Sequence, residues 1–372
     1  MKIEMKYDGY EVTYDDLGLL EAELEEFESD TKWLSDIESR SLNLTALEPI
    51  DTMLITDIPV SQEVFLDTTY KSKLMLTTTA GEKFMVRDTA IATLLETAKV
   101  NGSALGRLST AQFADVLNTC LSVARGNSLL LYRGEKICAV LSEGYVPMQI
   151  SRLLRETLKI LKSKFGTVRF VEGVNSYNIS SALFELPDAQ ENLIETYSQA
   201  VAAHRTRIHG RTFTPVVRFI SSDIGQSAAT LIPEFRLPSG AYFRINNGIR
   251  VAHKGSASID KYVEAIDGIY AKFCDLEKTM TKMAETYISH PLNALIGMCK
   301  RAGLPKALIT QAYEELEQFT GNDGCYMDDI YLSVASVTSG VTGSKLIGLE
   351  DTIAKLLHYQ WELYDVAGNV EI

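Results

Sequence analysis

Four basic residues recur at helical spacing in the segment that begins at Ser151, namely Arg152, Arg155, Lys159 and Lys162. Residues three or four positions apart lie on one face of a helix, and the leucines between these cations occupy the opposite face. The helix can therefore pack on a core while it presents four cations to the phosphates of a nucleic acid. The solvated face of an ordinary amphipathic helix is the alternative explanation.

A second basic cluster lies between residues 203 and 211 and contains Arg205, Arg207, Arg211 and two histidines. It lies between segments that have secondary-structure signals, which predicts a loop with exposed arginines. Guanidinium groups form bidentate contacts with phosphate and with carboxylate alike. This loop can thus bind nucleic acid or, equally, pair with the acidic residues 1 to 50, within one chain or between subunits.

The segment from Tyr242 to Gly255 combines aromatic with basic residues, among them Arg250, His253 and Lys254. Asn247-Gly248 separates two short β-rich runs in this segment, which predicts a hairpin turn. Cations beside aromatic rings are typical of single-strand nucleic-acid sites, where the rings stack on bases and the charges bind phosphates. Burial of the rings in a core is the competing interpretation.

Two motifs suggest phosphate chemistry but lack the context it needs. Tyr326-Met-Asp-Asp329 has the letters of a polymerase magnesium site, where two carboxylates lie at a hairpin tip. Here the tetrad leads into a helical pattern, with Asp323 or Asp328 placed to cap it. Gly340-Val-Thr-Gly-Ser-Lys345 has its lysine in the wrong order for a phosphate-binding loop, so we interpret it as a helix-terminal turn.

The histidines and cysteines give no sign of a metal site. The five histidines lack the i, i+4 or i, i+2 spacing of metal ligands, and the five cysteines are scattered without a Cys-x-x-Cys pair. We therefore predict no metal, no cofactor and buried free thiols in a reducing compartment. No residues can be assigned to catalysis, so we favour a binding protein over an enzyme.

The charge is distributed unevenly along the 372 residues. Of the net −13, residues 1 to 50 carry 14 acidic against 4 basic residues, whereas residues 150 to 218 carry ten basic against six acidic ones. A cationic surface is therefore possible on an acidic protein. The chain lacks a secretory signal pattern and a run of about 20 apolar residues, so we expect a cytoplasmic protein without membrane contacts.

Local patterns predict strands first and helices later. An acidic helix over residues 21–30 is expected, with Leu20, Leu24, Phe27 and Trp33 as its few anchors, in an arm that is either docked or mobile. We expect strands at 53–56, 64–66, 73–77 and 84–87, helices at 88–99 and 110–126, a hairpin over 128–142, a helix at 151–164, and strands at 167–171, 177–185, 215–220, 242–245 and 249–252. Helices are expected at 258–289, 292–302, 306–319, 327–339 and 349–363.

This order of elements indicates an α+β fold rather than alternating βαβ units. We predict a strand-rich mixed core with several packed helices, followed by an all-helical C-terminal region. The expected divisions are an acidic N-terminal arm over residues 1–50, an α+β core domain over 51–255 and the helical region over 256–372.

Glu135-Lys-Ile-Cys-Ala-Val-Leu-Ser-Glu-Gly-Tyr-Val-Pro-Met148 resembles a characteristic stretch of the domain-of-unknown-function 932 family, which bacteriophages and plasmids carry. Phe84 to Ala90, Ile245 to Gly255 and Asp328 to Thr338 are similar to further family segments, so the resemblance covers roughly residues 80 to 340. The family often has Asp-Arg-Tyr where this chain has Glu143-Gly-Tyr145, so no role for that arginine is transferred. The resemblance implies a mobile-element origin and no defined chemistry.

Two hypotheses follow. The first is a phage or plasmid accessory protein that binds nucleic acid, single-stranded in particular, and that anneals or protects it as a homo-oligomer in the bacterial host. The second is an inhibitor of a host defence or DNA-processing system, which would bind a host protein through an acidic, DNA-mimicking segment. The two hypotheses differ in the role of residues 1 to 50. An inhibitor needs this segment for its effect, whereas a nucleic-acid binder should bind as well or better without it.

Overall fold

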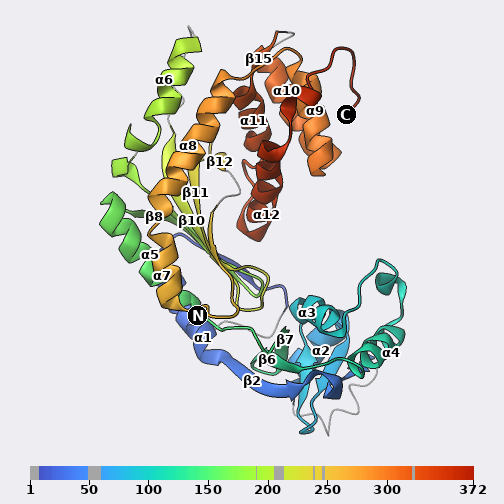
Figure 1. Cartoon of the computed structure of the whole chain (residues 1–372). Coiled ribbons are helices and arrows are strands. Elements are labelled where there is room, and N and C mark those ends of the chain that lie inside the picture. Colours follow the sequence, from blue (N-terminus) through green and yellow to red (C-terminus); the bar gives the residue numbers. More distant parts are fainter. Residues whose placement is uncertain are drawn as a thin grey trace.

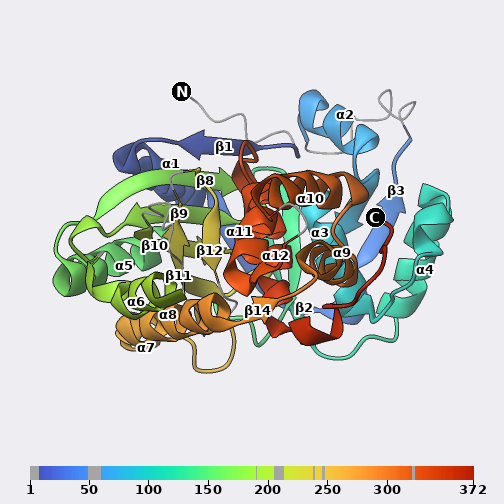
Figure 2. The same cartoon turned by 90° about the horizontal axis from the view of Figure 1, so that it is seen from above.

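A computed structural model describes residues 8–48, 60–189, 191–204, 213–237, 239–244, 248–320 and 323–372. The fold is α+β, as predicted, and contains two main sheets that belong to two lobes (Figures 1 and 2). The sheet A lobe comprises the described residues of 8–30 and 143–372, and the sheet B lobe comprises those of 31–142.

Sheet A is antiparallel throughout. Its strand order is β1 (Glu11–Tyr14), β8 (Arg169–Ser176), β9 (Ser180–Glu185), β10 (Thr214–Ser221), β11 (Ala229–Arg236) and β12 (Tyr242–Arg244), and β13 (Ile249–Val251) also pairs with β11. Alternate side chains point to opposite faces. In β10, Val217 and Phe219 therefore point into the main apolar core. The alternate residues Arg218 and Ile220 point to the opposite face and contact α12 (Gly343–Ala354).

Helices cover both faces of sheet A (Figure 1). One face carries α5 (Ile150–Phe165), α6 (Glu195–His204), α7 (Ile259–Ile266) and α8 (Ile269–Glu285). The other side carries α12 and α11 (Met327–Ser336), against which α9 (Pro291–Ala302) and α10 (Lys306–Thr320) pack. The C-terminal region is thus mainly helical, but it also contains the two-stranded sheet of β14 (Tyr287–Ile288) and β15 (Cys325–Tyr326), which corrects the all-helical expectation.

Sheet B combines antiparallel pairs with one parallel pair, β5 with β7. Its strand order is β2 (Thr31–Glu38), β6 (Asn127–Arg133), β7 (Lys136–Ser142), β5 (Lys83–Val86), β4 (Leu74–Thr77) and β3 (Asn43–Ala46). Its helices are α2 (Gln62–Tyr70), α3 (Asp88–Ala98) and α4 (Thr110–Leu121). Leu94 and Leu117 pack on one face of the sheet, whereas Phe65 packs with Met75 and Met85 on the other.

The described part of the acidic segment joins the two lobes and is no appendage. Strand β1 belongs to sheet A, and β2 and β3 belong to sheet B. Helix α1 (Leu17–Asp30) lies between them and buries Leu20, Leu24 and Phe27, the predicted anchors. Asp16 caps it by accepting a hydrogen bond from the Leu19 amide at 2.9 Å. The chain crosses between the lobes a second time at residues 143–149.

Several local predictions are confirmed because short-range chemistry determines them. The hairpin of β6 and β7 turns at Gly134 and Glu135, and Ser109 and Gln112 form the expected capping box of α4. The predicted helix over 258–289 divides at Gly268 into α7 and α8. The predicted strand at 64–66 is wrong, because these residues lie in α2, where Ser61 caps the helix.

The predicted hairpin at Asn247-Gly248 is also wrong. Strands β12 and β13 do not pair with each other; both pair with β11, at residues 234–236 and 229–231 respectively. Pro233 lies between these two stretches and has no amide hydrogen for the ladder. Gly248 approaches β11 so closely that a Cβ atom there would lie 2.8 Å from the Leu231 carbonyl oxygen. Gly248 therefore lies where the strands that pair with β11 are interrupted, and Asn247 lies outside the described residues.

Candidate functional site

A cleft of about 410 Å³ lies between the two lobes. The sheet B lobe contributes the end of α3 and the ends of β6 and β7. The sheet A lobe contributes residues near Gly225 and the segment from Arg250 to Lys254. Ligand sites occur preferentially in such clefts between domains, so the charges that line this one bear on function.

Four cations line the cleft, Lys99 and Arg125 from the sheet B lobe and Arg250 and Lys254 from the sheet A lobe. All four side chains are exposed, and Glu96 is the acidic residue beside them. In the part of the chain that the structure describes, none of these four side chains forms an ion pair or a hydrogen bond. An anion that enters the cleft therefore meets cations that need not break an internal contact first.

Local backbone structure explains how these cations reach the cleft. Lys99 ends α3 in the left-handed conformation, with φ of 56°. Arg125 precedes Gly126, whose φ of 83° turns the chain into β6. In β13, Ile249 is buried and Arg250 is exposed, as strand alternation requires. No local motif links Lys99 or Arg125 to the predicted site residues, so sequence reasoning did not find them.

His253 holds the segment 143–149, where the chain crosses between the lobes, against sheet A. Its ring is 6% exposed and stacks on Tyr145, with 5.3 Å between ring centroids. Because the Val146 carbonyl oxygen can only accept, Nδ1 donates to it at 3.3 Å, and Nε2 accepts from the Ser221 hydroxyl at 3.4 Å. Burial lowers the pKa of His253, so the ring is neutral at pH 7. His253 thus positions the cleft wall and adds no charge to it.

The predicted helix of cations is α5, which adopts the expected amphipathic form. Arg152, Arg155, Lys159 and Lys162 are all exposed, and none of them lines the cleft between the lobes. Both these residues and those near Arg250 are predicted nucleic-acid contacts, but the structure places the two sets on different surfaces.

Acidic groups already occupy part of the α5 surface. The Glu25 carboxylate of α1 pairs with Arg155 at 2.7 Å, and Glu156 pairs with Lys159 at the same distance. The neighbouring Glu28 accepts hydrogen bonds from the amide and hydroxyl of Ser151, at 2.8 and 2.7 Å. This carboxylate therefore occupies the N-terminal end of α5, where a free phosphate would otherwise bind. Arg205, Arg207 and Arg211 of the second predicted cluster lie outside the described residues.

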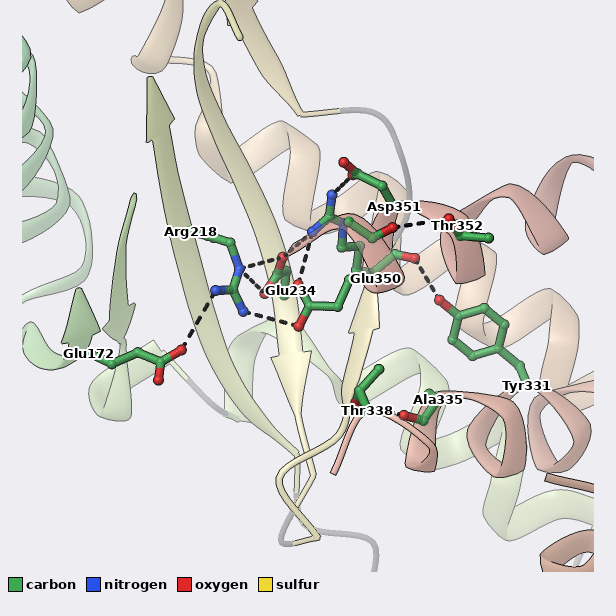
Figure 3. A network of polar contacts seen from close by, with 11 residues as sticks. Glu172, Arg218, Glu234, Tyr331, Ala335, Thr338, Glu350, Asp351 and Thr352 are labelled. Carbon is green, nitrogen blue, oxygen red and sulfur yellow. Dashed lines mark hydrogen bonds and ion pairs between the residues drawn. The ribbon is translucent and has the colours of Figure 1, made fainter. Parts of the chain in front are cut away.

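A buried ion network holds α12 against sheet A (Figure 3). Arg218 pairs with Glu234 at 3.3 Å and with Glu350 at 3.2 Å, and Arg244 pairs with the same two carboxylates at 3.3 and 3.1 Å. All four side chains are at most 3% exposed. Burial is the main cause that raises the pKa of Glu350 to about 7, against the opposing effect of Arg218. The network stabilises the packing of α12 on sheet A, and its burial keeps these arginines out of contact with phosphate.

Other predicted motifs have structural roles. Asp328 and Asp329 lie in the first turn of α11 instead of at a hairpin tip, and Asp328 accepts a hydrogen bond from the Tyr197 hydroxyl at 2.8 Å. Within the described ranges, no cluster of histidine, cysteine and carboxylate residues is arranged to hold a metal ion. Of the five free cysteines, Cys138, Cys299 and Cys325 are buried, as predicted, whereas Cys120 and Cys274 are partly exposed. No helix among the described residues has the length and apolar character that a bilayer crossing requires.

Comparisons with protein-family models, curated proteins and solved structures find no match to this chain. The resemblance to the domain-of-unknown-function 932 family therefore stays a prediction, and the cleft is the feature from which function can be inferred.

Proposed function

We propose that this protein binds nucleic acid in the cleft between its two lobes. The observation that carries the proposal is the set of four exposed cations, Lys99, Arg125, Arg250 and Lys254, beside one carboxylate, Glu96. Phosphate contacts supply most of the non-specific affinity for nucleic acid, and they require cations that are accessible and not already neutralised. The cleft satisfies both conditions on a chain whose net charge is −13.

Single-stranded nucleic acid is the substrate class that fits the cleft best. The cleft, at about 410 Å³, has the size of a small-ligand pocket. It therefore suits one or two extruded nucleotides better than it suits a duplex. The Tyr145 ring in its wall stacks on both His253 and Trp33, so it shapes the cleft and is not a free surface on which a base could stack. Annealing or protection by a homo-oligomer stays a further prediction of the same hypothesis.

The alternative of an acidic DNA mimic draws less support from the acidic segment itself. Glu25 and Glu28 contact α5, and Glu23 is buried and accepts a hydrogen bond from Tyr10. A mimic needs its carboxylates exposed in a row that a partner protein can reach, and these three are engaged within the chain.

The test is fluorescence anisotropy of labelled single-stranded and double-stranded oligonucleotides with nucleic-acid-free protein, at low and at physiological salt. We expect single strands to bind more tightly, with an affinity that falls steeply as salt rises, because bound phosphates release counterions. Absence of binding to both forms at low salt would overturn the proposal.

A further inference from the structure

A second, larger concavity adjoins the cleft on the sheet B lobe. This groove has a volume of about 1030 Å³ and runs along the outer side of α3. Helix α3 has 11 residues, so the groove is about 16 Å long at 1.5 Å per residue. Its other wall is the segment from Asn101 to Phe113, which turns back beside α3 before the capping box at Ser109 starts α4.

The groove and the cleft adjoin each other at the C-terminal end of α3. Glu96 and Lys99 line both of them. A ligand that binds Lys99 in the cleft therefore already lies at the near end of the groove.

The groove has an apolar middle and a basic far end. Its middle is formed by half-buried apolar side chains: Ile91, Leu95, Leu105, Leu108 and Phe113. Its far end carries Lys71 and Lys73, both exposed and, within the described ranges, without an ion pair, and Asp88 lies near them. Cleft and groove together present six lysine and arginine residues against the two carboxylates Asp88 and Glu96.

We propose that a single strand of nucleic acid continues from the cleft into this groove, with its bases on the apolar middle and its next phosphates at Lys71 and Lys73. This inference rests on the proposed function and adds the path of the strand. Alternation of apolar and aromatic surface with cations is how proteins bind unpaired nucleotides, since bases need a partner for stacking and phosphates need charge. A duplex hides its base faces and would gain nothing from the groove.

The first experiment measures affinity against oligonucleotide length. Oligonucleotides of roughly two nucleotides can fill the cleft alone, whereas those of roughly twelve can also fill the groove. We expect the long strand to bind the wild type at least tenfold more tightly than the short one. The Lys71→Glu/Lys73→Glu variant should lose most of that gain and keep the affinity for the short strand. The matched control is Lys282→Glu/Lys306→Glu, which reverses two exposed lysines that line neither concavity and should behave as wild type.

The second experiment reports on the groove without depending on affinity. Phe113→Trp places an indole in the apolar middle, and a base stacked on it should quench its fluorescence. We expect quenching by the long strand and none by the short strand, after subtraction of the signal of the two native tryptophans.

The outcomes separate the two proposals. Equal binding of the long strand by the lysine variant and the wild type, with no quenching of the indole in Phe113→Trp, would overturn the path along α3 and leave the cleft intact. Absence of binding at every length would overturn the proposed function itself.

Discussion

Helix α5 and the cleft between the lobes each present four exposed cations, but they differ in what surrounds those cations. On α5, Arg155 and Lys159 pair with carboxylates, and Glu28 occupies the helix N-terminus. In the cleft, the four cations are unpaired within the described part of the chain and face one carboxylate. Exposed ion pairs contribute little to stability, yet each must be broken before phosphate can bind. Availability of a cation, more than its position in a basic pattern, therefore distinguishes the two surfaces.

The largest expected effect comes from reversing two charges in the cleft. Arg125→Glu/Arg250→Glu changes one arginine in each lobe, and it should weaken binding of a single strand about 100-fold at low salt, since two charge-assisted contacts of about 1.5 kcal/mol each are lost. The matched control is Arg152→Glu/Lys162→Glu, an identical change of charge at exposed α5 residues that we expect to alter the dissociation constant less than threefold. Anisotropy measures both. A larger loss of affinity in the α5 variant than in the cleft variant would mean that the binding site lies on α5.

The dependence of binding on salt sharpens the same comparison. For single strands, the logarithm of the binding constant falls with the logarithm of salt concentration with a slope of about −0.7 per neutralised phosphate. The slope for Arg125→Glu/Arg250→Glu should therefore be shallower by about 1.4 than that of the wild type. The α5 variant should keep the wild-type slope. An unchanged slope in the cleft variant would mean that neither arginine contacts phosphate.

Buried charges provide a third case, in which charge affects stability and leaves binding unchanged. Burial raises the pKa of Glu350 to about 7, above its ordinary value of 4.5. Between these two pH values the folded state holds a proton that the unfolded state has released, so the unfolding free energy falls as pH rises from about 4.5 to about 7. In Glu350→Gln this part of the pH dependence should disappear, as measured by denaturant unfolding across the range. Affinity for nucleic acid should stay as in the wild type, because Glu350 lines neither the cleft nor the groove.

Sequence predicted the parts of the fold that short-range chemistry controls. The hairpin of β6 and β7, the capping box at Ser109 and the amphipathic face of α5 all follow from residues within a few positions of one another. Strand β11 was missed because its sequence, with Pro233 in the middle, lacks a strand pattern, although the sheet accommodates the proline beside an interrupted edge.

The candidate site was only partly predictable, because it depends on contacts between distant segments. Arg250, His253 and Lys254 were identified from a local mixture of charge and aromatic residues, and they lie in the cleft. Lys99 and Arg125 come from the end of a helix and from a turn in the other lobe, and no spacing connects them to Arg250. Likewise, sequence could not reveal that Arg218 and Arg244 are buried by α12, more than 100 residues away.

The fold also changes how the acidic segment must be tested. Deletion of residues 1 to 50 would remove β1, α1, β2 and β3 and so disrupt both sheets. A substitution that keeps the shape of the side chains is the informative variant.

The smallest expected effect is that of Glu25→Gln/Glu28→Gln, which removes the two α1 charges from α5. Loss of a charged partner at the start of α5 should reduce the unfolding free energy by about 1 kcal/mol, by comparison with other losses of a helix cap. It also frees Arg155 and the N-terminal end of α5, so the variant tests whether α1 shields this surface from nucleic acid. If the cleft is the site, the dissociation constant should change less than twofold, because long-range attraction is screened over about 10 Å at 0.1 M salt. A tenfold gain in affinity would instead show that α5 binds phosphate once α1 releases it, and the two surfaces would then act together.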